Sequence, residues 1–268
     1  MSPLHDATVD ATVDATVARR ALALVDLTNL TDPCSQAAID DLCRKAAGPF
    51  GSTAAVCIWP RFVTRAVEHL AGSGVAVATV VNFPTGDDDI SSTVTLTRSA
   101  LADGADEIDL VLPYRSFLAG RTDIAAAMID AVRSVAGPDV LLKVILESGS
   151  YPTLDSIRDA ARLAIDHGAD FIKTSTGKTY VSATIGATVM ILDAIRSGDR
   201  KVGIKPSGGI GSLADAARYL AVADEMMGPD WVTPATFRFG ASGLLDALET
   251  ALSRDLDLDP PGPEADGG

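Results

Sequence analysis

The sequence predicts an α/β protein with the architecture of a single (β/α)8 TIM barrel. Eight short apolar runs alternate with stretches of helical periodicity along the 268 residues. The runs are apolar on both faces, which is typical of parallel strands buried between a core and a layer of helices. Eight β–α units are the number that closes a barrel. An open doubly wound sheet is the alternative, but no GxGxxG motif follows the first run to support it.

Each element has its own signal in the sequence. The predicted strands, in chain order, cover residues 22–28, 54–59, 75–81, 107–112, 140–146, 170–174, 202–205 and 236–240. Among the predicted helices, residues 154–165 keep apolar side chains at helical spacing, and Gly168 follows as a C-terminal stop. Ser212 and Asp215 resemble a capping box at the start of a later helix, with Asp in place of the usual Glu.

The two ends of the chain differ from the predicted barrel, which we place at residues 17–253. Residues 6–17 repeat Asp-Ala-Thr-Val three times, and a repeat this short cannot form a solenoid. We predict a low-complexity N-terminal arm over residues 1–16, with a leading helix that enters residues 17–24 as the alternative. Residues 254–268 are rich in proline, glycine and acidic residues, so we predict a disordered C-terminal tail.

Composition excludes several classes of protein. The formal net charge of −14 leaves no excess of Lys and Arg to neutralise nucleic-acid phosphates, and an anionic membrane surface would repel the chain. The three cysteines lack CxxC spacing and indicate neither a disulfide framework nor a zinc site. Acidic residues stand where a signal peptide would be apolar, and no apolar run could span a bilayer. We therefore predict a soluble cytoplasmic protein without nucleic-acid or membrane partners.

Charged side chains lie within the predicted strands or at their ends, where the active site of such a barrel is found. Asp26 and Asp109 belong to the first and fourth runs, and Lys143, Lys173 and Lys205 to the fifth, sixth and seventh. Burying an ammonium group is costly, yet three of the six lysines of the chain are embedded in apolar strands. Crowding and burial both favour the neutral amine, which forms Schiff bases with carbonyl groups without a metal. The alternative is a structural network in which these lysines neutralise the two aspartates.

Glycine-rich segments follow three adjacent predicted strands. They have the sequences TSTGK at residues 174–178, PSGGIG at residues 206–211 and GASG at residues 240–243. Glycine lets backbone N–H groups approach an anion closely, and the last segment opens a helix, whose N-terminus attracts negative charge. Barrels frequently bind phosphate after the last two strands, so we predict a phosphate site here. Ordinary turns are the alternative for each segment taken alone.

These segments and several others resemble the deoxyribose-phosphate aldolase family over about residues 17–250. The most specific matches are FIKTSTGK at residues 171–178 and GIKPSGG at residues 203–209. Shorter matches are DLT at 26–28, AVCIWPRF at 55–62, VNFP at 81–84, ADEID at 105–109, LKVILE at 142–147 and RFGAS at 238–242. The resemblance implies the barrel fold. It also implies reversible cleavage of 2-deoxy-D-ribose 5-phosphate to D-glyceraldehyde 3-phosphate and acetaldehyde through a lysine Schiff base, in deoxyribose phosphate catabolism.

The resemblance also implies roles for individual residues. Lys173 matches the Schiff-base lysine, Lys205 the neighbour that favours its neutral amine, and Asp109 the proton-relay carboxylate, which acts through a water molecule. Asp26 and Lys143 match the supporting polar shell. We add Cys57 to this shell, although a buried cysteine is usually an apolar filler. The phosphate site would consist of Gly177, Lys178, Gly208, Gly209, Gly240 and Ser242.

The chain departs from some relatives at the predicted phosphate site and at its end. Some relatives carry Arg where this chain has Gly211, and a second Ser where it has Gly243. We therefore expect backbone N–H groups and Lys178 to hold most of the phosphate. Some relatives end in a tyrosine that assists proton transfer, but this chain has no tyrosine after Tyr219, so water is expected to replace it.

Two other functions stay open on the sequence alone. A sugar-phosphate isomerase would need a Glu or His base rather than a lysine pair, and a non-catalytic sugar-phosphate sensor would not need Lys173, Lys205 and Asp109 together. A divalent-metal site is one interpretation of Asp87, Asp88 and Asp89. We expect instead a solvated turn whose charges favour the start of the following helix. We expect small-molecule substrates, no cofactor and no metal. A homo-oligomer is compatible with the sequence.

Overall fold

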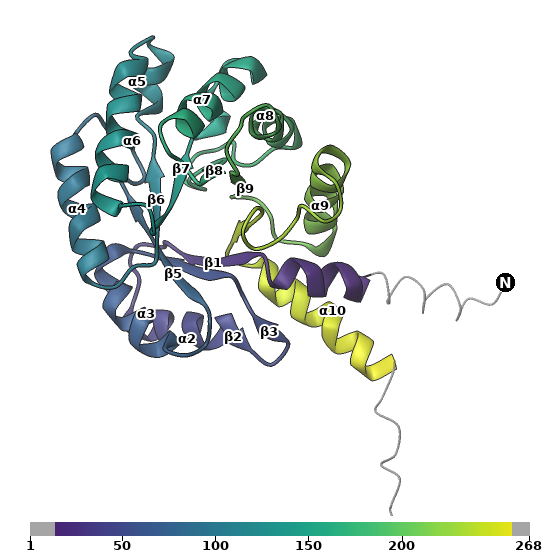
Figure 1. Ribbon diagram of the computed structural model, residues 1–268. Coiled ribbons are helices and arrows are strands. Elements are labelled where there is room, and N and C mark those ends of the chain that lie inside the picture. Colours follow the sequence, from purple (N-terminus) through teal and green to yellow (C-terminus); the bar gives the residue numbers. More distant parts are fainter. Residues whose placement is uncertain (1–13, 259–268) are drawn as a thin grey trace, which may run out of the picture.

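A computed structural model describes residues 14–258 of the chain. Eight strands form one parallel sheet that curls into a barrel, in the order β10-β1-β4-β5-β6-β7-β8-β9 (Figure 1). Two isolated parallel bridges, from Ile204 to Phe237 and from Ser207 to Gly240, join the two edges of this sheet. The barrel is thus nearly closed, and the predicted fold class is confirmed.

The strands and helices alternate as predicted. The barrel strands are β1 (Val25–Asn29), β4 (Ala55–Ile58), β5 (Ala76–Val81), β6 (Glu107–Val111), β7 (Leu141–Ile145), β8 (Phe171–Lys173), β9 (Gly203–Lys205) and β10 (Phe239–Ala241). The helices are α2 (Gln36–Ala46), α3 (Val63–Leu70), α4 (Ile90–Ala102), α5 (Tyr114–Leu118), α6 (Thr122–Ala136), α7 (Leu154–Asp166), α8 (Ile185–Arg196), α9 (Leu213–Met227) and α10 (Leu244–Leu258). Short 3-10 helices, η1 (Pro60–Phe62) and η2 (Ser148–Ser150), follow β4 and β7.

Each predicted apolar run contains one strand, but the first and last runs are shifted. β1 starts at Val25 rather than at residue 22, because residues 14–22 form a helix that enters the strand through a turn. β10 lies at the end of its run and extends to Ala241. A two-stranded hairpin of β2 (Ala47–Gly48) and β3 (Gly51–Ser52) was not predicted, since strands of two residues show no periodicity.

The predicted helix start signals are present in the structure. Ser212 accepts a hydrogen bond from the Asp215 backbone N–H, and the Asp215 carboxylate accepts one from the Ser212 N–H, which completes the capping box of α9. Asp89 caps α4 by accepting from the Ser92 N–H, as expected for a solvated acidic turn before a helix. Gly168 follows α7 with a positive φ of 98°.

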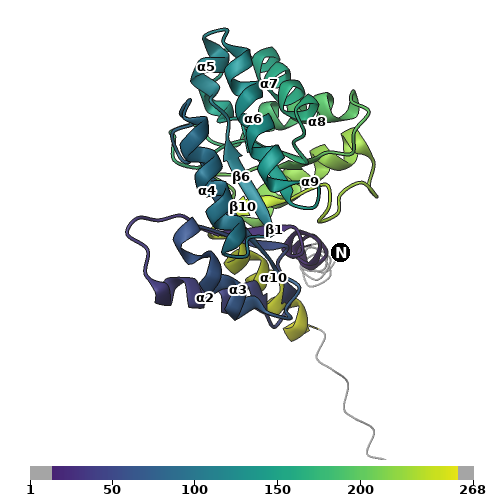
Figure 2. The same ribbon diagram turned by 60° about the vertical axis from the view of Figure 1, so that its left-hand side comes forward.

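The predicted arm and tail lie largely outside the described residues. Among the described residues of the arm and tail, residues 14–16 are helical and α10 continues to Leu258. Regular structure therefore extends beyond the barrel bounds of 17 and 253 that we predicted. The N-terminal helix lies beside α10 in two views, and Arg19 forms an ion pair with Asp255 between them (Figures 1 and 2). No helix among residues 14–258 is both long enough and apolar enough to cross a membrane.

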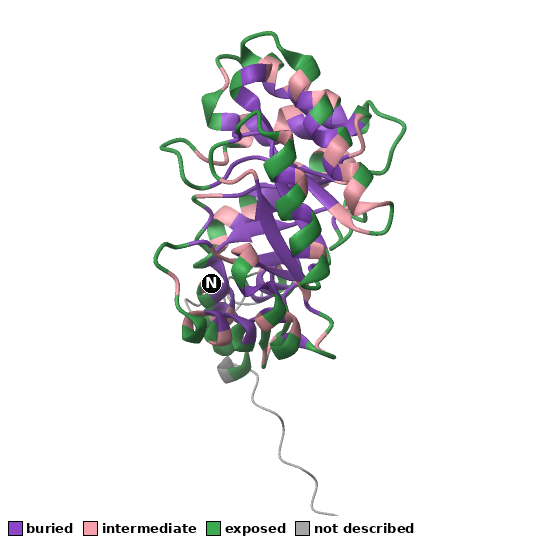
Figure 3. Cartoon of the chain, turned by 90° about the vertical axis from the view of Figure 1, so that its left-hand side faces the viewer, coloured by how far each residue is buried: buried purple, intermediate pink, exposed green. Residues whose placement is uncertain are grey.

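The barrel strands are buried on both faces, and the helices expose their outer sides (Figure 3). One set of alternate residues packs against the helices: Val56, Ile58, Ile108, Leu110, Leu142, Val144, Ile172 and Ile204. The other set points into the barrel, where small clusters contain Ala55, Cys57, Ala78, Val80, Val111 and Ile145. Asp109, Lys143, Lys173 and Lys205 belong by position to this inner set, because side chains alternate along a strand.

Candidate active site

Strand register brings the predicted charged residues together inside the barrel. Asp109 on β6 pairs in register with Lys143 on β7, and Lys173 on β8 pairs with Lys205 on β9. Each of these side chains is at most 2% exposed. Neighbouring parallel strands place paired residues about 4.8 Å apart, so lysine side chains that point inward reach a common centre.

Asp109 is that common centre. Its Oδ1 accepts a hydrogen bond from the Nζ of Lys143 at 2.8 Å, and its Oδ2 accepts from the Nζ atoms of Lys173 and Lys205, each at 2.8 Å. Burial alone would raise the pKa of the Asp109 carboxyl, but the three ammonium groups outweigh it and hold that pKa well below its usual range. Asp109 is therefore ionised and shared among three lysines.

A second layer of charges lies next to this centre. Asp26 approaches the Nζ of Lys205 at 2.6 Å and accepts a hydrogen bond from Arg238 at 2.7 Å. Glu107 binds Lys143 and accepts from Arg238 at 3.2 Å. We did not predict Glu107 or Arg238 as site residues, although both are charged residues within predicted apolar strands, the same signal that singled out the lysines.

The buried cluster carries more positive than negative groups when all are ionised. Lys143, Lys173, Lys205 and Arg238 face the three carboxylates of Asp26, Glu107 and Asp109. Lys143 contacts three of these carboxylates, Lys205 two and Lys173 one. Lys173 thus has the fewest carboxylate partners of the three lysines.

The charges of Lys205 and Lys143 are held by their carboxylates. Burial alone would lower the pKa of Lys205, but Asp109 and Asp26 outweigh it and raise that pKa above the ordinary lysine value. The pKa of Lys143 is likewise raised, by Asp109 and Glu107. Both groups therefore act as fixed positive charges near Lys173, and the ion network that we considered as an alternative exists alongside the lysine cluster.

Cys57 lies at the edge of this cluster. Its Sγ is 3.8 Å from Asp109 Oδ2, and the side chain is fully buried among apolar neighbours on the inner face of the barrel. Burial raises the pKa of the Cys57 thiol. Cys57 therefore fills space as a neutral thiol and touches the polar shell at one point.

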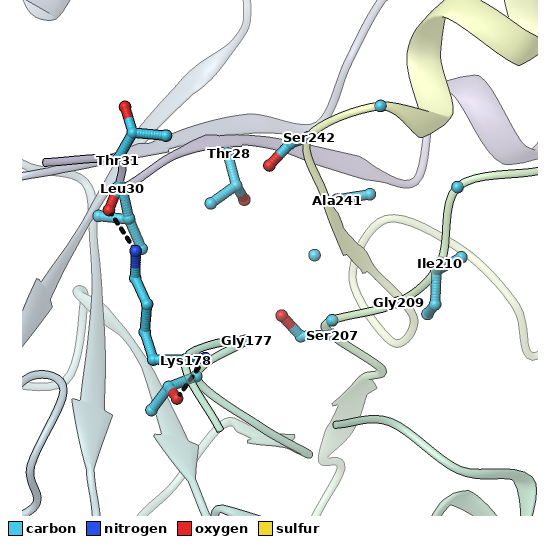
Figure 4. A pocket seen from close by; sticks show the side chains of 15 residues that line it. Thr28, Leu30, Thr31, Gly177, Lys178, Ser207, Gly209, Ile210, Ala241 and Ser242 are labelled. Atoms are coloured by element: carbon cyan, nitrogen blue, oxygen red, sulfur yellow. Dashed lines mark hydrogen bonds between the residues drawn. The ribbon is translucent and has the colours of Figure 1, made fainter. Parts of the chain in front are cut away.

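A cavity of about 420 Å³ opens at the carboxyl ends of β1, β8, β9 and β10 (Figure 4). All six residues predicted to bind phosphate line it. The complete lining is Thr28, Leu30, Thr31, Thr176, Gly177, Lys178, Ser207, Gly208, Gly209, Ile210, Gly211, Gly240, Ala241, Ser242 and Gly243. We call this cavity the anion pocket. Sequence reasoning missed the contribution of β1, because residues 28–31 contain no glycine signal.

The anion pocket lies directly next to the lysine cluster. A Cβ atom at Gly240 would lie 3.1 Å from Cε of Lys205 and 2.4 Å from Oγ of Ser207. Gly208 has a φ of 89°, and a Cβ there would lie 2.6 Å from Ser182. At these two positions only glycine fits, and Gly240 allows the pocket wall to approach Lys205.

Backbone N–H groups of the pocket are free to bind an anion. Among the described residues, those of Gly177, Gly209, Ile210, Ser242 and Gly243 donate to no protein acceptor. The last two immediately precede α10, whose N-terminus carries a partial positive charge. Free N–H groups at a helix N-terminus and a glycine-rich turn are the features of an anion site.

Side chains complete the pocket from opposite sides. Lys178 extends along one wall and its Nζ donates to the Leu30 carbonyl at 2.7 Å, while Ser207 and Ser242 face each other across the space (Figure 4). Gly211 lines the rim, but its N–H donates to Asp215 at 3.3 Å. The Gly211 N–H is therefore occupied by the capping carboxylate of α9. Among residues 14–258 no group of His, Cys, Asp and Glu side chains forms a candidate metal site.

The fold and the position of the site define a class of protein. A (β/α)8 barrel with a polar pocket at the carboxyl ends of its strands is an α/β-barrel enzyme, since active sites of such barrels lie at this end. The chain belongs to the DeoC/LacD family of aldolases, whose family model matches residues 9–248. The family resemblance inferred from the motifs is thereby confirmed.

Individual relatives agree with this assignment. A deoxyribose-phosphate aldolase from Agrobacterium fabrum is 52% identical over 247 residues, which cover 92% of this chain and 95% of the relative. A solved structure from Toxoplasma gondii, provisionally assigned as a deoxyribose-phosphate aldolase, has a TM-score of 0.84 at 27% identity and covers 91% of this chain and 97% of its own. The tetrameric deoxyribose phosphate aldolase of Aeropyrum pernix shares the fold, with a TM-score of 0.72 at 20% identity over 93% of this chain and 98% of its own.

Proposed function

We propose that this protein is a deoxyribose-phosphate aldolase that cleaves 2-deoxy-D-ribose 5-phosphate through a Schiff base on Lys173, without a metal or cofactor. The observation that carries the proposal is the position of Lys173. Its amine is buried in the lysine cluster, in which Lys205 borders the anion pocket, and it has one carboxylate partner, Asp109, which it shares with two other lysines. A lysine amine that has given up its proton is the nucleophile that forms a Schiff base with an aldehyde substrate.

The reaction follows from this arrangement. The Lys173 amine adds to the C1 aldehyde of the open-chain sugar, and loss of water leaves a protonated imine. Removal of the C3 hydroxyl proton breaks the C2–C3 bond, and the electron pair moves into the imine, giving an enamine and glyceraldehyde 3-phosphate. The enamine gains a proton at C2, and hydrolysis of the resulting imine releases acetaldehyde and the free amine. The protein must therefore accept a proton and return one within each turnover.

We assign the proton relay to Asp109, acting through a water molecule. Its carboxylate touches Lys173 directly, and its contacts with Lys143 and Lys205 keep it ionised until Lys173 becomes part of the imine. Lys205 supplies a positive charge next to Lys173, since both amines donate to the same oxygen of Asp109. Asp26 and Lys143 support this pair within the buried network, and Cys57 packs beside it.

The anion pocket is the proposed site of the 5-phosphate. Free N–H groups at residues 177, 209, 242 and 243 and the ammonium of Lys178 would bind its oxygens, with Ser242 adding a hydroxyl. Gly240 would allow the phosphate end of the substrate to lie close to Lys205. We further propose that the enzyme acts in the cytoplasm in the breakdown of deoxyribose phosphate, and its self-association stays a prediction.

The proposed function is tested by following acetaldehyde release from deoxyribose 5-phosphate with a coupled alcohol dehydrogenase and NADH. We expect turnover that survives prior treatment of the enzyme with EDTA. A sugar-phosphate isomerase would instead give a five-carbon product and no acetaldehyde, and a non-catalytic sensor would give no product. Either of these results would contradict the proposal.

Replacement of Lys205 by methionine should move the acid limb of kcat/KM to higher pH. Lys205 keeps its charge because Asp109 and Asp26 raise its pKa. Removing this positive neighbour makes protonation of the Lys173 amine easier, so a higher pH is needed to reach the neutral form. The variant should stay folded, because three cations and three carboxylates remain in the cluster.

The matched control for this variant is Lys201→Met, which removes an exposed lysine outside the cluster. Its pH profile should be that of the wild type. An unchanged acid limb with full activity in Lys205→Met would show that the charge of Lys205 does not act on Lys173.

Gly211→Arg should increase the preference of the enzyme for the phosphorylated sugar over 2-deoxyribose, mainly through KM. A side chain at position 211 starts at the rim of the anion pocket, and a Cβ there meets no atom within 4 Å. A charge-assisted hydrogen bond contributes roughly 1.5–3 kcal/mol, which corresponds to about one to two decades in kcat/KM. The ratio of kcat/KM for the two sugars measures this preference.

Gly211→Gln separates charge from side-chain size in this experiment and should change the ratio much less than Gly211→Arg. If the folded arginine variant leaves the ratio of the two sugars unchanged, position 211 does not reach the phosphate.

A further inference from the structure

Glu147 is a buried carboxylate that the proposed mechanism does not use. It follows β7, its backbone has a left-handed conformation with φ 59° and ψ 56°, and its side chain is fully buried. A residue with a Cβ seldom adopts this conformation, and burial of a carboxylate requires hydrogen bonds to offset the loss of water. Two unfavourable features at one residue indicate that the surrounding structure requires this placement.

The backbone around Glu147 runs beside the segment that carries Lys173. The Leu146 N–H donates to the Lys173 carbonyl at 3.0 Å, and the Ser148 N–H donates to the Thr174 carbonyl at 2.8 Å. The left-handed turn between these two bonds directs the Glu147 side chain to residues 176–179, which we call the lysine loop. The strand register thus sets the distance between Glu147 and this loop.

Among residues 14–258, the hydrogen-bond donors to the Glu147 carboxylate all belong to the lysine loop. Its Oε1 accepts from the Thr176 N–H at 3.4 Å and from the Thr179 hydroxyl at 3.1 Å, and its Oε2 accepts from the Thr176 hydroxyl. Every one of these partners is a neutral donor. The carboxylate therefore holds the two ends of a four-residue loop together rather than balancing a cation.

The hydrogen bonds continue from Glu147 to the anion pocket. The Thr176 hydroxyl donates a hydrogen bond to Glu147 and accepts one from the Lys178 N–H at 3.1 Å. Between these residues lies Gly177, which has a φ of 74° and a free N–H in the pocket wall. The Nζ of Lys178 donates to the Leu30 carbonyl along the same wall of the pocket. Glu147 thus determines where Gly177 and Lys178 lie, although it does not line the pocket itself.

We propose that Glu147 is a positioning residue that holds the lysine loop as one wall of the anion pocket and so sets the affinity for the phosphate group of the substrate. This proposal rests on the proposed function only in naming the phosphate-bearing substrate. It predicts an effect on phosphate binding with little effect on the chemistry at Lys173.

The test compares Glu147→Gln with the wild-type protein in the full chain. Gln has the same shape but turns one acceptor oxygen into a donor, which then faces the donors of the loop. We expect the Kd for inorganic phosphate, measured by calorimetry, and the KM for deoxyribose 5-phosphate both to rise by roughly a decade, the effect of losing one charge-assisted hydrogen bond. The kcat/KM for unphosphorylated 2-deoxyribose should stay within about twofold, because the phosphate contact is absent there.

Two further variants test the route from Glu147 to Lys178. Thr176→Val removes the hydroxyl and should weaken phosphate binding as Glu147→Gln does. Thr176→Ser keeps the hydroxyl and should bind phosphate with the wild-type Kd. Thr97→Val is the control for loss of a buried hydrogen bond, since its hydroxyl donates to the Thr93 carbonyl within α4. It should lower Tm without changing the Kd for phosphate. If Glu147→Gln does not fold, Thr179→Val removes one Glu147 contact at an exposed position and takes its place.

The outcomes separate this proposal from the proposed function. A folded Glu147→Gln protein with the wild-type Kd for phosphate, or one that loses activity equally on both sugars, overturns the positioning role. Absence of phosphate binding by the wild-type protein overturns it as well. Failure of the wild type to cleave either sugar would overturn the proposed function, and the calorimetric comparison would still decide the role of Glu147.

Discussion

Lys173→Ala is expected to lower kcat/KM for deoxyribose 5-phosphate to less than about a thousandth of the wild-type value, because the covalent route is lost. The two neighbouring lysines cannot replace it. Lys143 and Lys205 contact three and two carboxylates, and these contacts raise the pKa of both groups, so both remain protonated. The measurement is a coupled assay of acetaldehyde release.

The variant should keep its fold, since removal of Lys173 leaves three cations facing three carboxylates in the cluster. Lys201→Ala, which truncates an exposed lysine, is the matched control and should keep full activity. Turnover above about a thousandth of the wild-type value in a folded Lys173→Ala protein would show that another lysine is the nucleophile.

Asp109→Asn should have the largest combined effect on stability and activity. Asp109 accepts hydrogen bonds from three buried ammonium groups, and its loss leaves four cations facing two carboxylates. Removal of one partner from a buried ion pair costs about 3–5 kcal/mol of unfolding free energy. Loss of the proton relay should lower kcat by about two to four decades. Denaturant unfolding and the coupled assay measure the two effects.

The stability effect should depend on pH in a defined direction. The pKa of Asp109 is depressed in the folded state, so its contribution is fully present above the unfolded carboxyl pKa of about 3.9 and is lost as the pH falls towards the folded value. In the Asn variant the surplus ammonium groups are less favourable in the folded state than in the unfolded state. Its deficit relative to the wild type should therefore shrink as the pH rises towards about 10.

Asp130→Asn is a suitable control, because Asp130 pairs with His167 at the protein surface. Exposed ion pairs contribute little, so this variant should unfold like the wild type. Equal stability of Asp109→Asn and the wild type near neutral pH would show that Asp109 does not compensate the buried lysines.

The architecture could be predicted from the sequence because strands buried on both faces appear there as short apolar runs. The run at residues 140–146 is apolar on both faces apart from Lys143, and it contains the barrel strand β7. Elements that do not bury apolar side chains at a regular spacing have no such pattern in the sequence. The hairpin of β2 and β3 was missed for that reason, and the N-terminal helix made the predicted start of β1 too early.

The lysines could be predicted as a cluster for a related reason. A charged residue in an apolar strand is costly, so each one indicates a partner. Which partners meet depends on strand register, which the sequence does not show. Arg238 and Asp26 are 212 positions apart yet hydrogen-bonded, because β10 and β1 are neighbours in the sheet.

The proposed phosphate site could be predicted from its glycines, but the residue that holds the lysine loop could not. A positive φ at a glycine is anticipated by the residue type itself, whereas Glu147 adopts one without any such signal. The sequence shows only a carboxylate at the end of the segment LKVILE, and the structure is needed to show that Lys143 of this segment binds other carboxylates instead.

The central claim is that the Lys173 amine forms a Schiff base, and borohydride trapping tests it most directly. The full chain is incubated with acetaldehyde, reduced with borohydride, digested and mapped by mass spectrometry. The imine forms with loss of water, and hydride addition to its carbon fixes it as an N-ethyl group. The account predicts that N-ethyl-lysine appears at Lys173 in the wild type and in no peptide of Lys173→Ala. Modification of Lys143 or Lys205 instead, or of no lysine in an enzyme that still cleaves deoxyribose 5-phosphate, would contradict it.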